Sequence, residues 1–205
     1  MSADLEFRYR LRHSAVLEPL AHKLEEHLRE IINGAPRIDR IQARAKGPSR
    51  FLAKAEKENG NEKKYNDPLN QIQDQIGVRI ITFYLSDVEE ISSIVQKYFR
   101  HIERRQVVPE SDVSFGYFGF HYILPVPSDI IDQNWNRDHV PEFFELQIKT
   151  LFQHAWSEAN HDLGYKELQG DLTGDSRRRM AWASAQAWGA DQIFDELFRA
   201  YANKE

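Results

Sequence analysis

The spacing of apolar side chains along the chain predicts helices at both ends and strands between them. Residues 14–32 place apolar side chains three and four positions apart, which predicts an amphipathic helix that stops at NGAP, residues 33–36. A shorter helix is expected to begin near Ser49, followed by a loop over ENGNEKKYNDP at 58–68. Further helices are predicted at 87–99, 149–165 and 176–201.

Three segments instead read as β-strands. VRIITFY at 78–84 and YFGFHYIL at 117–124 are rich in β-branched and aromatic residues. In FFELQI at 143–148, apolar side chains alternate with Glu145 and Gln147, which therefore point to the opposite face of the strand. Strands interleaved with helices predict an α/β or α+β domain, in which a mixed β-sheet is flanked by helices.

Composition narrows the class of protein. Hydrophobic residues make up 41% of the 205, yet no apolar run approaches the ~20 residues that a membrane-spanning helix needs. The chain has no cysteine, which excludes disulfides and thiolate metal sites. We expect a cytoplasmic protein with no membrane contact. Its expected parts are an N-terminal helical segment (1–36), a central domain (37–170) and a C-terminal helix (171–205).

Charge is distributed unevenly. The formal net charge is −5, but residues 40–64 carry eight Lys or Arg against three Glu. That segment is therefore +5 and the rest of the chain −10. A basic segment in an acidic chain indicates a local anionic ligand more than a general nucleic-acid surface, although charge alone favours a solvated basic helix.

Asp74, Arg79 and Glu145 are polar residues in strand-like surroundings. Taken singly, Asp74 is explained as a loop carboxylate, Glu145 as an outward residue of an edge strand, and Arg79 as facing solvent, an anion or a carboxylate. Together they indicate a nucleotide site. Mg²⁺ held mainly by phosphates needs one or two protein carboxylates, and phosphoryl transfer needs cations around the transferred group. No P-loop occurs, so side chains must hold the phosphates. Candidates within RAKGPSRFLAK are Arg44, Lys46, Ser49 and Lys54.

The 149–165 helix carries His154, Glu158 and His161 at positions i, i+4 and i+7, roughly on one face. The H-E-x-x-H register of zinc metalloproteases is absent, so a zinc site is disfavoured. A histidine beside a tryptophan in an amphipathic helix is more often a packing or hydrogen-bonding residue than a ligand. The single His-Asp pair at 161–162 is likewise no evidence for a hydrolase.

Four sequence blocks, in order, resemble the synthetase domain of the RelA/SpoT family, whose members make the alarmone nucleotides ppGpp and pppGpp. RAKGPSRFLAK (44–54) resembles the basic R-x-K-x-x-S block, and DQIGVRI (74–80) is similar to the D-x-x-G-x-R-I block. GYFGFHYIL (116–124) resembles the G-Y-x-S-x-H acceptor loop and strand. ELQIKTLFQHAWSEANHDLGYK (145–166) resembles the E-x-Q-I-R-T block and its helix. The resemblance runs from about 37 to 166 and implies a nucleotidyltransferase-like fold.

The resemblance implies a pyrophosphokinase that transfers the β,γ-pyrophosphate of ATP to the ribose 3′-hydroxyl of GDP or GTP and releases AMP. It implies that Arg44 and Arg79 enclose the adenine. The other implied ATP contacts are Lys46, Ser49, Lys54 and Arg105 (or Arg104). Asp74 and Glu145 are implied as catalytic residues and Mg²⁺ ligands, with Glu145 the base for the acceptor hydroxyl. The implied acceptor residues are Tyr117, stacked on the base, with His121, Gln147 and His154.

Departures from the family pattern leave the acceptor open. Gly119 replaces the usual serine and Lys149 the usual arginine, while Glu110 and Asp112 stand where members with nucleotide acceptors carry a lysine. Acidic residues near the 5′-phosphates are unfavourable. The alternative acceptor is the 3′ end of tRNA, as in toxin-like relatives, and an antitoxin partner would accompany it. The net charge argues mildly against tRNA, so the alarmone interpretation is preferred.

Two hypotheses from other classes remain. A non-catalytic nucleotide-binding module is disfavoured because both Asp74 and Glu145 are present. A helix-bundle interaction protein accounts for the terminal helices but not for Arg79 within a strand. We also expect a stand-alone synthetase without a hydrolase domain. The aromatic last helix either packs on its own domain or forms a homo-oligomer.

Overall fold

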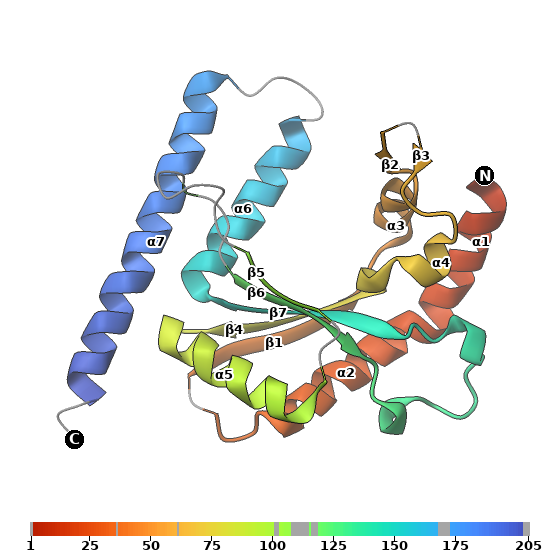
Figure 1. Cartoon of the computed structure of the whole chain (residues 1–205), viewed down its shortest axis with the longest axis horizontal. Helices are drawn as coiled ribbons and strands as arrows, with labels where there is room; N and C mark the ends of the chain where they lie inside the picture. The colour runs from red at the N-terminus through yellow and green to blue at the C-terminus, as the bar shows by residue number, and fades with distance from the viewer. Residues whose placement is uncertain are drawn as a thin grey trace.

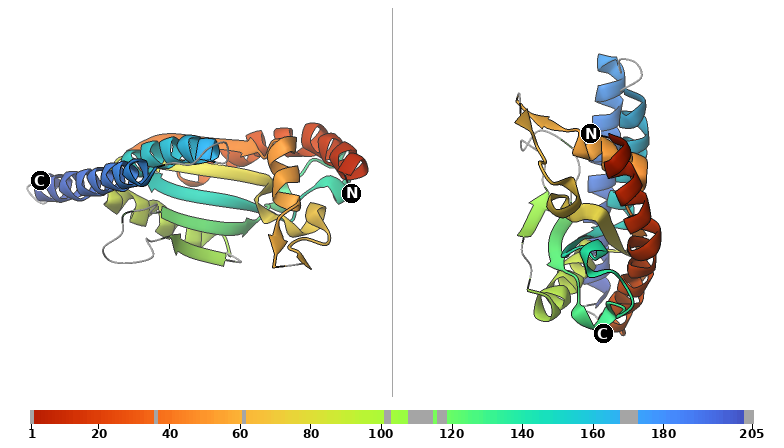
Figure 2. Two further views of the ribbon diagram at one scale, coloured as in Figure 1. Left: turned by 90° about the horizontal axis from the view of Figure 1, so that it is seen from above. Right: turned by 90° about the vertical axis from the view of Figure 1, so that its right-hand side faces the viewer.

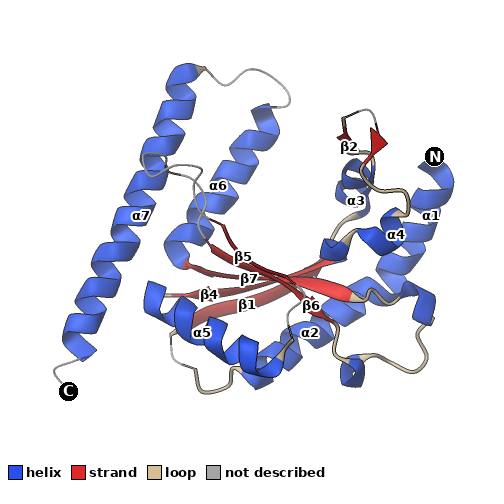
Figure 3. Ribbon diagram, viewed as in Figure 1, coloured by secondary structure: helices blue, strands red, loops and turns tan. Residues whose placement is uncertain are grey.

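Five strands form the central sheet: β1 (Ile38–Ala45), β4 (Ile76–Thr82), β5 (Glu103–Val107), β6 (Gly119–Pro125) and β7 (Phe143–Thr150). Their order is β1-β4-β7-β6-β5, with β4 and β7 parallel and the other neighbours antiparallel. The computed structural model describes residues 2–35, 37–60, 62–100, 103–107, 115, 119–167 and 173–202. Within them, a mixed sheet flanked by helices confirms the predicted fold class (Figures 1 and 3).

Helices lie on both sides of this sheet. They are α1 (Ser2–Arg12), a π-helical turn (His13–Leu17), α2 (Glu18–Ile31), α3 (Pro48–Ala55), α4 (Pro68–Gln71), α5 (Leu85–Tyr98), α6 (Leu151–Glu167) and α7 (Gly174–Ala202). In Figure 1, α2 and α5 lie below the sheet, whereas α3 and α6 rise above it on opposite sides. Short 3-10 turns occupy Gln73–Gln75, Ser128–Ile130 and Arg137–His139, and β2 (Glu58–Asn59) pairs with β3 (Glu62–Lys63).

The hydrophobic core lies between the sheet and the pair α2 and α5. Because side chains alternate along a strand, β4 and β7 each send every second residue into this core. Its fully buried strand residues include Val78, Ile80, Leu146, Ile148 and Tyr122. Leucines of α2 and aliphatic residues of α5 pack onto them. The residues between them in sequence, Arg79, Glu145, Gln147 and His121, therefore lie on the opposite, polar face.

The structure corrects four predictions about elements. The N-terminal helix begins at Ser2 rather than at residue 14, because charged residues between 2 and 12 obscure the periodicity that buries Tyr9. Strand β1 was not predicted, since half of its sequence IDRIQARA is polar and only Ile41 in it is buried. The expected 58–68 loop contains the β2–β3 hairpin, and the charged strand β5 was also missed. The described ends of the other predicted elements lie within two residues of the predicted ones.

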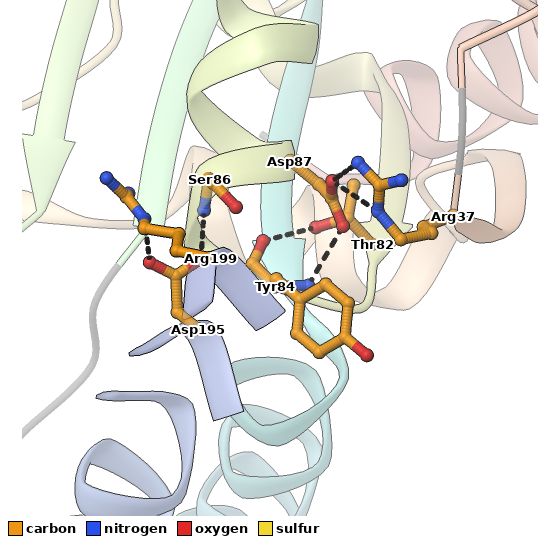
Figure 4. A network of polar contacts seen from close by, with 7 residues as sticks. All are labelled: Arg37, Thr82, Tyr84, Ser86, Asp87, Asp195 and Arg199. Atoms are coloured by element: carbon orange, nitrogen blue, oxygen red, sulfur yellow. Dashed lines mark hydrogen bonds and ion pairs between the residues drawn. The ribbon is translucent and has the colours of Figure 1, made fainter. Parts of the chain in front are cut away.

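Helix α7 extends past the ends of the strands on the side where β7 finishes, and the two chain ends lie at opposite ends of the molecule (Figure 2). Polar contacts fasten α7 where α5 begins and β7 ends. Asp195 Oδ1 accepts the backbone N–H of Ser86 at 2.8 Å, and Arg199 Nε binds Asp195 Oδ2 at 2.7 Å (Figure 4). Thr150, the last residue of β7, donates its hydroxyl to Asp191 Oδ2 at 2.8 Å. No helix among the described residues is long and apolar enough to cross a membrane.

Asp191 links α7 to the sheet, and its contribution to the free energy of unfolding depends on pH. Burial raises the pKa of Asp191 to about 7, although the Thr150 hydroxyl opposes the rise. Asp191 Oδ1 makes no hydrogen bond with any residue the structure describes. Below 3.8, the ordinary pKa of an aspartate carboxyl, both the folded and the unfolded chain carry this proton. As the pH rises through 7, the buried carboxyl must ionise and its contribution to the free energy of unfolding is lost.

We therefore expect Asp191→Asn to stabilise the protein more at pH 8 than at pH 5. The gap in the free energy of unfolding should be roughly 3 kcal/mol, from about 1.4 kcal/mol per pKa unit. Urea unfolding at the two pH values measures it. Asp175→Asn, at an exposed position on the same helix, is the matched control. An equal shift at both pH values would contradict the buried-proton explanation.

Candidate functional site

The polar face of the sheet opens into a cleft of about 1220 Å³. Cross-strand pairing aligns its floor: Arg79 lies beside Gln147, and Gln147 lies beside His121. One row along, Gly77 lies between Arg44 and Glu145. Gly77 has no side chain and nothing lies within 4 Å of the space a Cβ would fill, so the floor is open there. The predicted site residues that line the cleft are Arg44, Lys46, Ser49, Asp74, Arg79, Glu145 and Gln147.

Asp74 is held by two lysines. Lys46 Nζ lies 3.0 Å and Lys54 Nζ 2.8 Å from Asp74 Oδ2. Burial by itself raises the pKa of Asp74, but the two ammonium groups outweigh burial and keep this pKa below its usual value. Asp74 Oδ1 is buried and makes no hydrogen bond with any described residue. Since buried carboxylate oxygens are normally partnered, this oxygen is suited to a cation.

Backbone contacts fix the spacing between these charges. Lys46 directly follows β1 and donates its backbone N–H to the carbonyl of Gln75, next to Asp74, at 2.8 Å. Pro48 then starts α3, whose last turn carries Lys54. The Tyr9 hydroxyl of α1 donates to the Lys46 carbonyl at 2.6 Å. Three segments far apart in sequence thus hold two ammonium groups on one carboxylate.

Glu145 is oriented by its neighbours on the sheet. His121 Nδ1 lies 3.2 Å from Glu145 Oε1, and Gln147 Nε2 donates to Glu145 Oε2 at 2.8 Å. Burial raises the pKa of Glu145, but His121 and Gln147 outweigh it and lower this pKa below its usual value. Glu145 is therefore ionised at neutral pH. The charge of Asp74 also reaches Glu145 and raises its pKa, which places the two carboxylates within electrostatic range.

These two carboxylates suit a metal ion that arrives with phosphates. Among the residues the structure describes, no group of three or more His, Asp or Glu side chains is arranged to hold a metal alone. Asp74 and Glu145 provide the one or two carboxylates that Mg²⁺ needs when phosphate and water oxygens complete its shell. The orphaned Asp74 Oδ1 fits that requirement.

Arg44 and Arg79 form the other end of the cleft. They lie on the neighbouring strands β1 and β4, two positions apart in register, and both line the cleft. Burial lowers the pKa of Arg44, and the charges of Arg79 and Arg50 lower it further. Arg79 Nη1 also contacts Glu158 Oε1 at 2.8 Å. Of the environments considered for Arg79, the structure therefore places a carboxylate beside it. Neighbouring guanidinium planes favour a planar or anionic ligand, because guanidinium stacks on π-systems and pairs with anions.

The remaining predicted residues are more scattered. Arg105 is exposed on β5 opposite His121, and so lies on the polar face, whereas Arg104 stacks over Phe120 at 5.1 Å. His154 has a pKa lowered by burial and by the charge of Lys149, and its Nδ1 has no hydrogen bond to a described residue. Tyr117 lies outside the described residues. The roles assigned to all predicted site residues remain predictions.

Sequence reasoning missed two residues that line the cleft, and it did not predict the burial of Lys149. Glu25 and Arg29 of α2 line it, and Glu25 accepts the Ala43 N–H of the edge strand β1 at 2.9 Å. Lys149 is 2% exposed, burial lowers its pKa to about 8, and its Nζ lies 3.3 Å from Ser157 Oγ. Two signals pointed to its position: the alternation along β7, which puts Lys149 on the polar face, and its place where the family pattern has an arginine.

The cleft combines paired lysines on one carboxylate, two arginines and a second ionised carboxylate on a mixed sheet. This arrangement suits a domain that binds nucleotide phosphates. Residues 43–170 match the family model described as the region found in RelA / SpoT proteins. The chain belongs to the RelA/SpoT family. The predicted family and the predicted class of enzyme, a pyrophosphotransferase of this family, are thereby confirmed.

Individual relatives agree with this assignment. The chain is 26% identical over 165 residues to the GTP pyrophosphokinase YjbM of Bacillus subtilis (strain 168), covering 78% of this chain and 72% of the relative. A GTP pyrophosphokinase family protein from Streptococcus pneumoniae has the same fold, with a TM-score of 0.75 at 22% identity, covering 100% of this chain and 97% of that one. For the small alarmone synthetase 1 from Bacillus subtilis the TM-score is 0.74 at 22% identity, covering 98% and 100%.

Proposed function

We propose that this protein transfers the β,γ-pyrophosphate of ATP to the ribose 3′-hydroxyl of GDP or GTP and releases AMP. The observation that carries the proposal is the Lys46–Asp74–Lys54 cluster in one cleft with the ionised Glu145. Structures of small alarmone synthetase 1 from Bacillus subtilis bound to its product pppGpp and to AMPCPP share this fold, with TM-scores of 0.70 and 0.67. They support nucleotides as both substrates.

At the donor end, Arg44 and Arg79 enclose the adenine of ATP. Lys46, Ser49 and Lys54 contact its phosphates, for which the lysines are already gathered on Asp74. Asp74 and Glu145 hold Mg²⁺, which when bound neutralises phosphate charge that develops during transfer. The lysines act in the same sense, since phosphoryl transfer is accelerated mainly by positioning and charge neutralisation.

At the acceptor end, Glu145 accepts the proton of the ribose 3′-hydroxyl. The 3′-oxygen forms a bond to the β-phosphorus, and the bond from that phosphorus to the bridging oxygen of AMP breaks. His121 and Gln147, which contact the two oxygens of Glu145, hold the carboxylate in place. They border the acceptor pocket together with Tyr117 and His154. Arg105, on the same sheet face, assists with the donor phosphates.

Purified protein, Mg²⁺ and ATP labelled at the γ-phosphate test the proposal. GDP, GTP and deacylated tRNA are offered in parallel. Label on GDP or GTP supports an alarmone synthetase. Label on tRNA alone replaces it with the toxin-type function, which the acidic Glu110 and Asp112 favour, and makes an antitoxin partner the next question. ATP binding without transfer identifies a binding module, and no ATP binding restores the helix-bundle hypothesis.

Tyr117→Ala should damage acceptor use far more than ATP binding, because an aromatic ring stacked on a base contributes about 1–3 kcal/mol. We expect the KM for GDP or GTP to rise by roughly tenfold or more. Steady-state kinetics and titration with ATP alone separate the two effects. Tyr98→Ala, at a position 65% exposed on α5, is the matched control. Equal loss of ATP and acceptor binding would remove the stacking role.

Two further proposals concern organisation. The chain is divided into an N-terminal helical segment (1–36), a synthetase domain (37–170) and a C-terminal helix (171–205). Assembly of several copies through the terminal helices is supported by apolar side chains that α7 leaves exposed: Trp182, Trp188, Ile193, Phe194, Leu197 and Tyr201.

A further inference from the structure

Glu158 joins α6 to the floor of the cleft. Helix α6 rises from the end of β7, and Glu158 Oε1 reaches Arg79 Nη1, on the neighbouring strand β4, at 2.8 Å. Glu158 lines the same cleft as Arg44 and Arg79. The sequence showed Glu158 only as one member of the His154–Glu158–His161 face, and neither a zinc site nor the proposed chemistry uses it.

Glu158 is the counter-charge of a cationic group. Burial lowers the pKa of Arg44, Lys149 and His154, and the charge of Arg79 lowers each further. The charge of Glu158 opposes this in all three, raising each pKa. The carboxylate therefore lies amid four basic side chains, although its only ion pair shown among the described residues is with Arg79.

The contact restricts a side chain whose backbone is already fixed. Arg79 lies inside β4, with Gln42 on one neighbouring strand and Gln147 on the other. Its guanidinium ends a long side chain that carries about 2 kcal/mol of rotamer entropy. The contact of Glu158 with Nη1 restricts that group inside the cleft that both residues line.

Stability alone does not account for the pair. The side chain of Glu158 is 46% exposed, and ion pairs at such positions contribute little to the free energy of folding. Glu158 lies at the cleft, where it can orient the Arg79 guanidinium. A misplaced binding group lowers the affinity for a ligand even when the fold is intact.

We propose that Glu158 is a positioning residue that orients the Arg79 guanidinium against the purine of the donor nucleotide. The proposal rests on the proposed function, in which Arg44 and Arg79 enclose the adenine. It adds a residue of α6 to the donor pocket, so that the helix following β7, the strand of Glu145, completes this pocket.

Glu158→Ala is expected to raise the Kd and KM for Mg·ATP by about tenfold, with the acceptor KM and kcat unchanged. Glu158→Gln, which can still accept a hydrogen bond from Arg79, should fall between wild type and Glu158→Ala. Calorimetric titration with Mg·ATP and no acceptor measures the Kd. The matched control is Glu90→Gln, an exposed glutamate of α5 on the far side of the sheet. Thermal unfolding should shift little in any of these variants.

Coupling distinguishes positioning from a general charge effect. If Glu158 acts through Arg79, then Glu158→Ala should weaken Mg·ATP binding little further in an Arg79→Ala background. Full additivity would overturn the proposal. Unchanged or tighter Mg·ATP binding by Glu158→Ala alone would also overturn it, because the carboxylate would then be competing with the nucleotide for Arg79.

These outcomes are separable from failure of the proposed function. If the wild-type protein labels neither GDP, GTP nor tRNA, the proposed transfer reaction is wrong. The Mg·ATP titrations of the Glu158 and Arg79 variants still test the positioning role. Transfer by the wild type, together with ATP binding unaffected by Glu158→Ala, removes only the positioning role.

Discussion

Replacement of Glu145 by glutamine is expected to lower the rate of pyrophosphate transfer by about 10²–10⁴-fold, the usual contribution of a general base. Glutamine keeps the size of the side chain and an oxygen for the Gln147 amide, but it has no negative charge and cannot take a proton. His121 and Gln147 hold Glu145 ionised in the wild type, so the substitution removes a charge that is present at neutral pH.

ATP binding should largely survive the same substitution, because the lysines and arginines that hold the donor are unchanged. Single-turnover transfer and ATP titration, each with Glu142→Gln as an exposed control just before β7, make the comparison. If Glu145→Gln transferred pyrophosphate at the wild-type rate, the base would have to be another group. If it lost ATP binding in proportion, Glu145 would serve as a metal ligand for the donor rather than as the base.

Strands β4 and β7, which carry the site, were predictable because they are rich in large apolar residues. In β4 and β7 every second residue is fully buried and most of these are Ile, Val or Leu, so the polar residues between them had to share the other face. That alternation placed Arg79, Glu145 and Gln147 together before any contact was known. Strand β1 gave no such signal, since as an edge strand it buries little and half of its residues are polar.

The contacts between blocks were not predictable, because they depend on tertiary packing. The basic block and Asp74 each suggested phosphate chemistry, but no local pattern shows that Lys46 and Lys54 meet one oxygen of Asp74. The pairing of Arg79 with Glu158 joins a strand to a helix about 80 positions later in the sequence. Periodicity within either element carries no information about it.

The N-terminal helix shows how far support for the site reaches beyond the matched region. Residues 43–170 match the family model, yet Tyr9 of α1 bonds the Lys46 carbonyl and stacks on Phe51 of α3 at 3.6 Å. Arg12 is 3% exposed and donates to Gln75 Oε1 at 3.1 Å and to the Leu69 carbonyl. A buried guanidinium saturated by neutral oxygens fixes the turn that carries Asp74.

Replacement of Asp74 by asparagine tests whether this turn holds the metal. We expect transfer with Mg²⁺ to fall by about 10²–10³-fold, the size of effect seen when one preorganised charge-stabilising group is lost. Asparagine preserves the shape of the side chain but removes the charge that balances Lys46 and Lys54. Those lysines then face the nucleotide without a competing carboxylate.

The effect on ATP binding should therefore change sign with the metal. Without Mg²⁺, Asp74→Asn should bind ATP as tightly as the wild type or more tightly, because a negative charge beside the phosphates is gone. With Mg²⁺ it should bind more weakly, because a ligand of the ion is gone. Titrations with and without Mg²⁺ measure both, and Asp67→Asn, an exposed carboxylate outside the cleft, is the control. A loss of ATP affinity that is the same with and without Mg²⁺ would exclude Asp74 as the metal ligand and leave it the role of holding the two lysines.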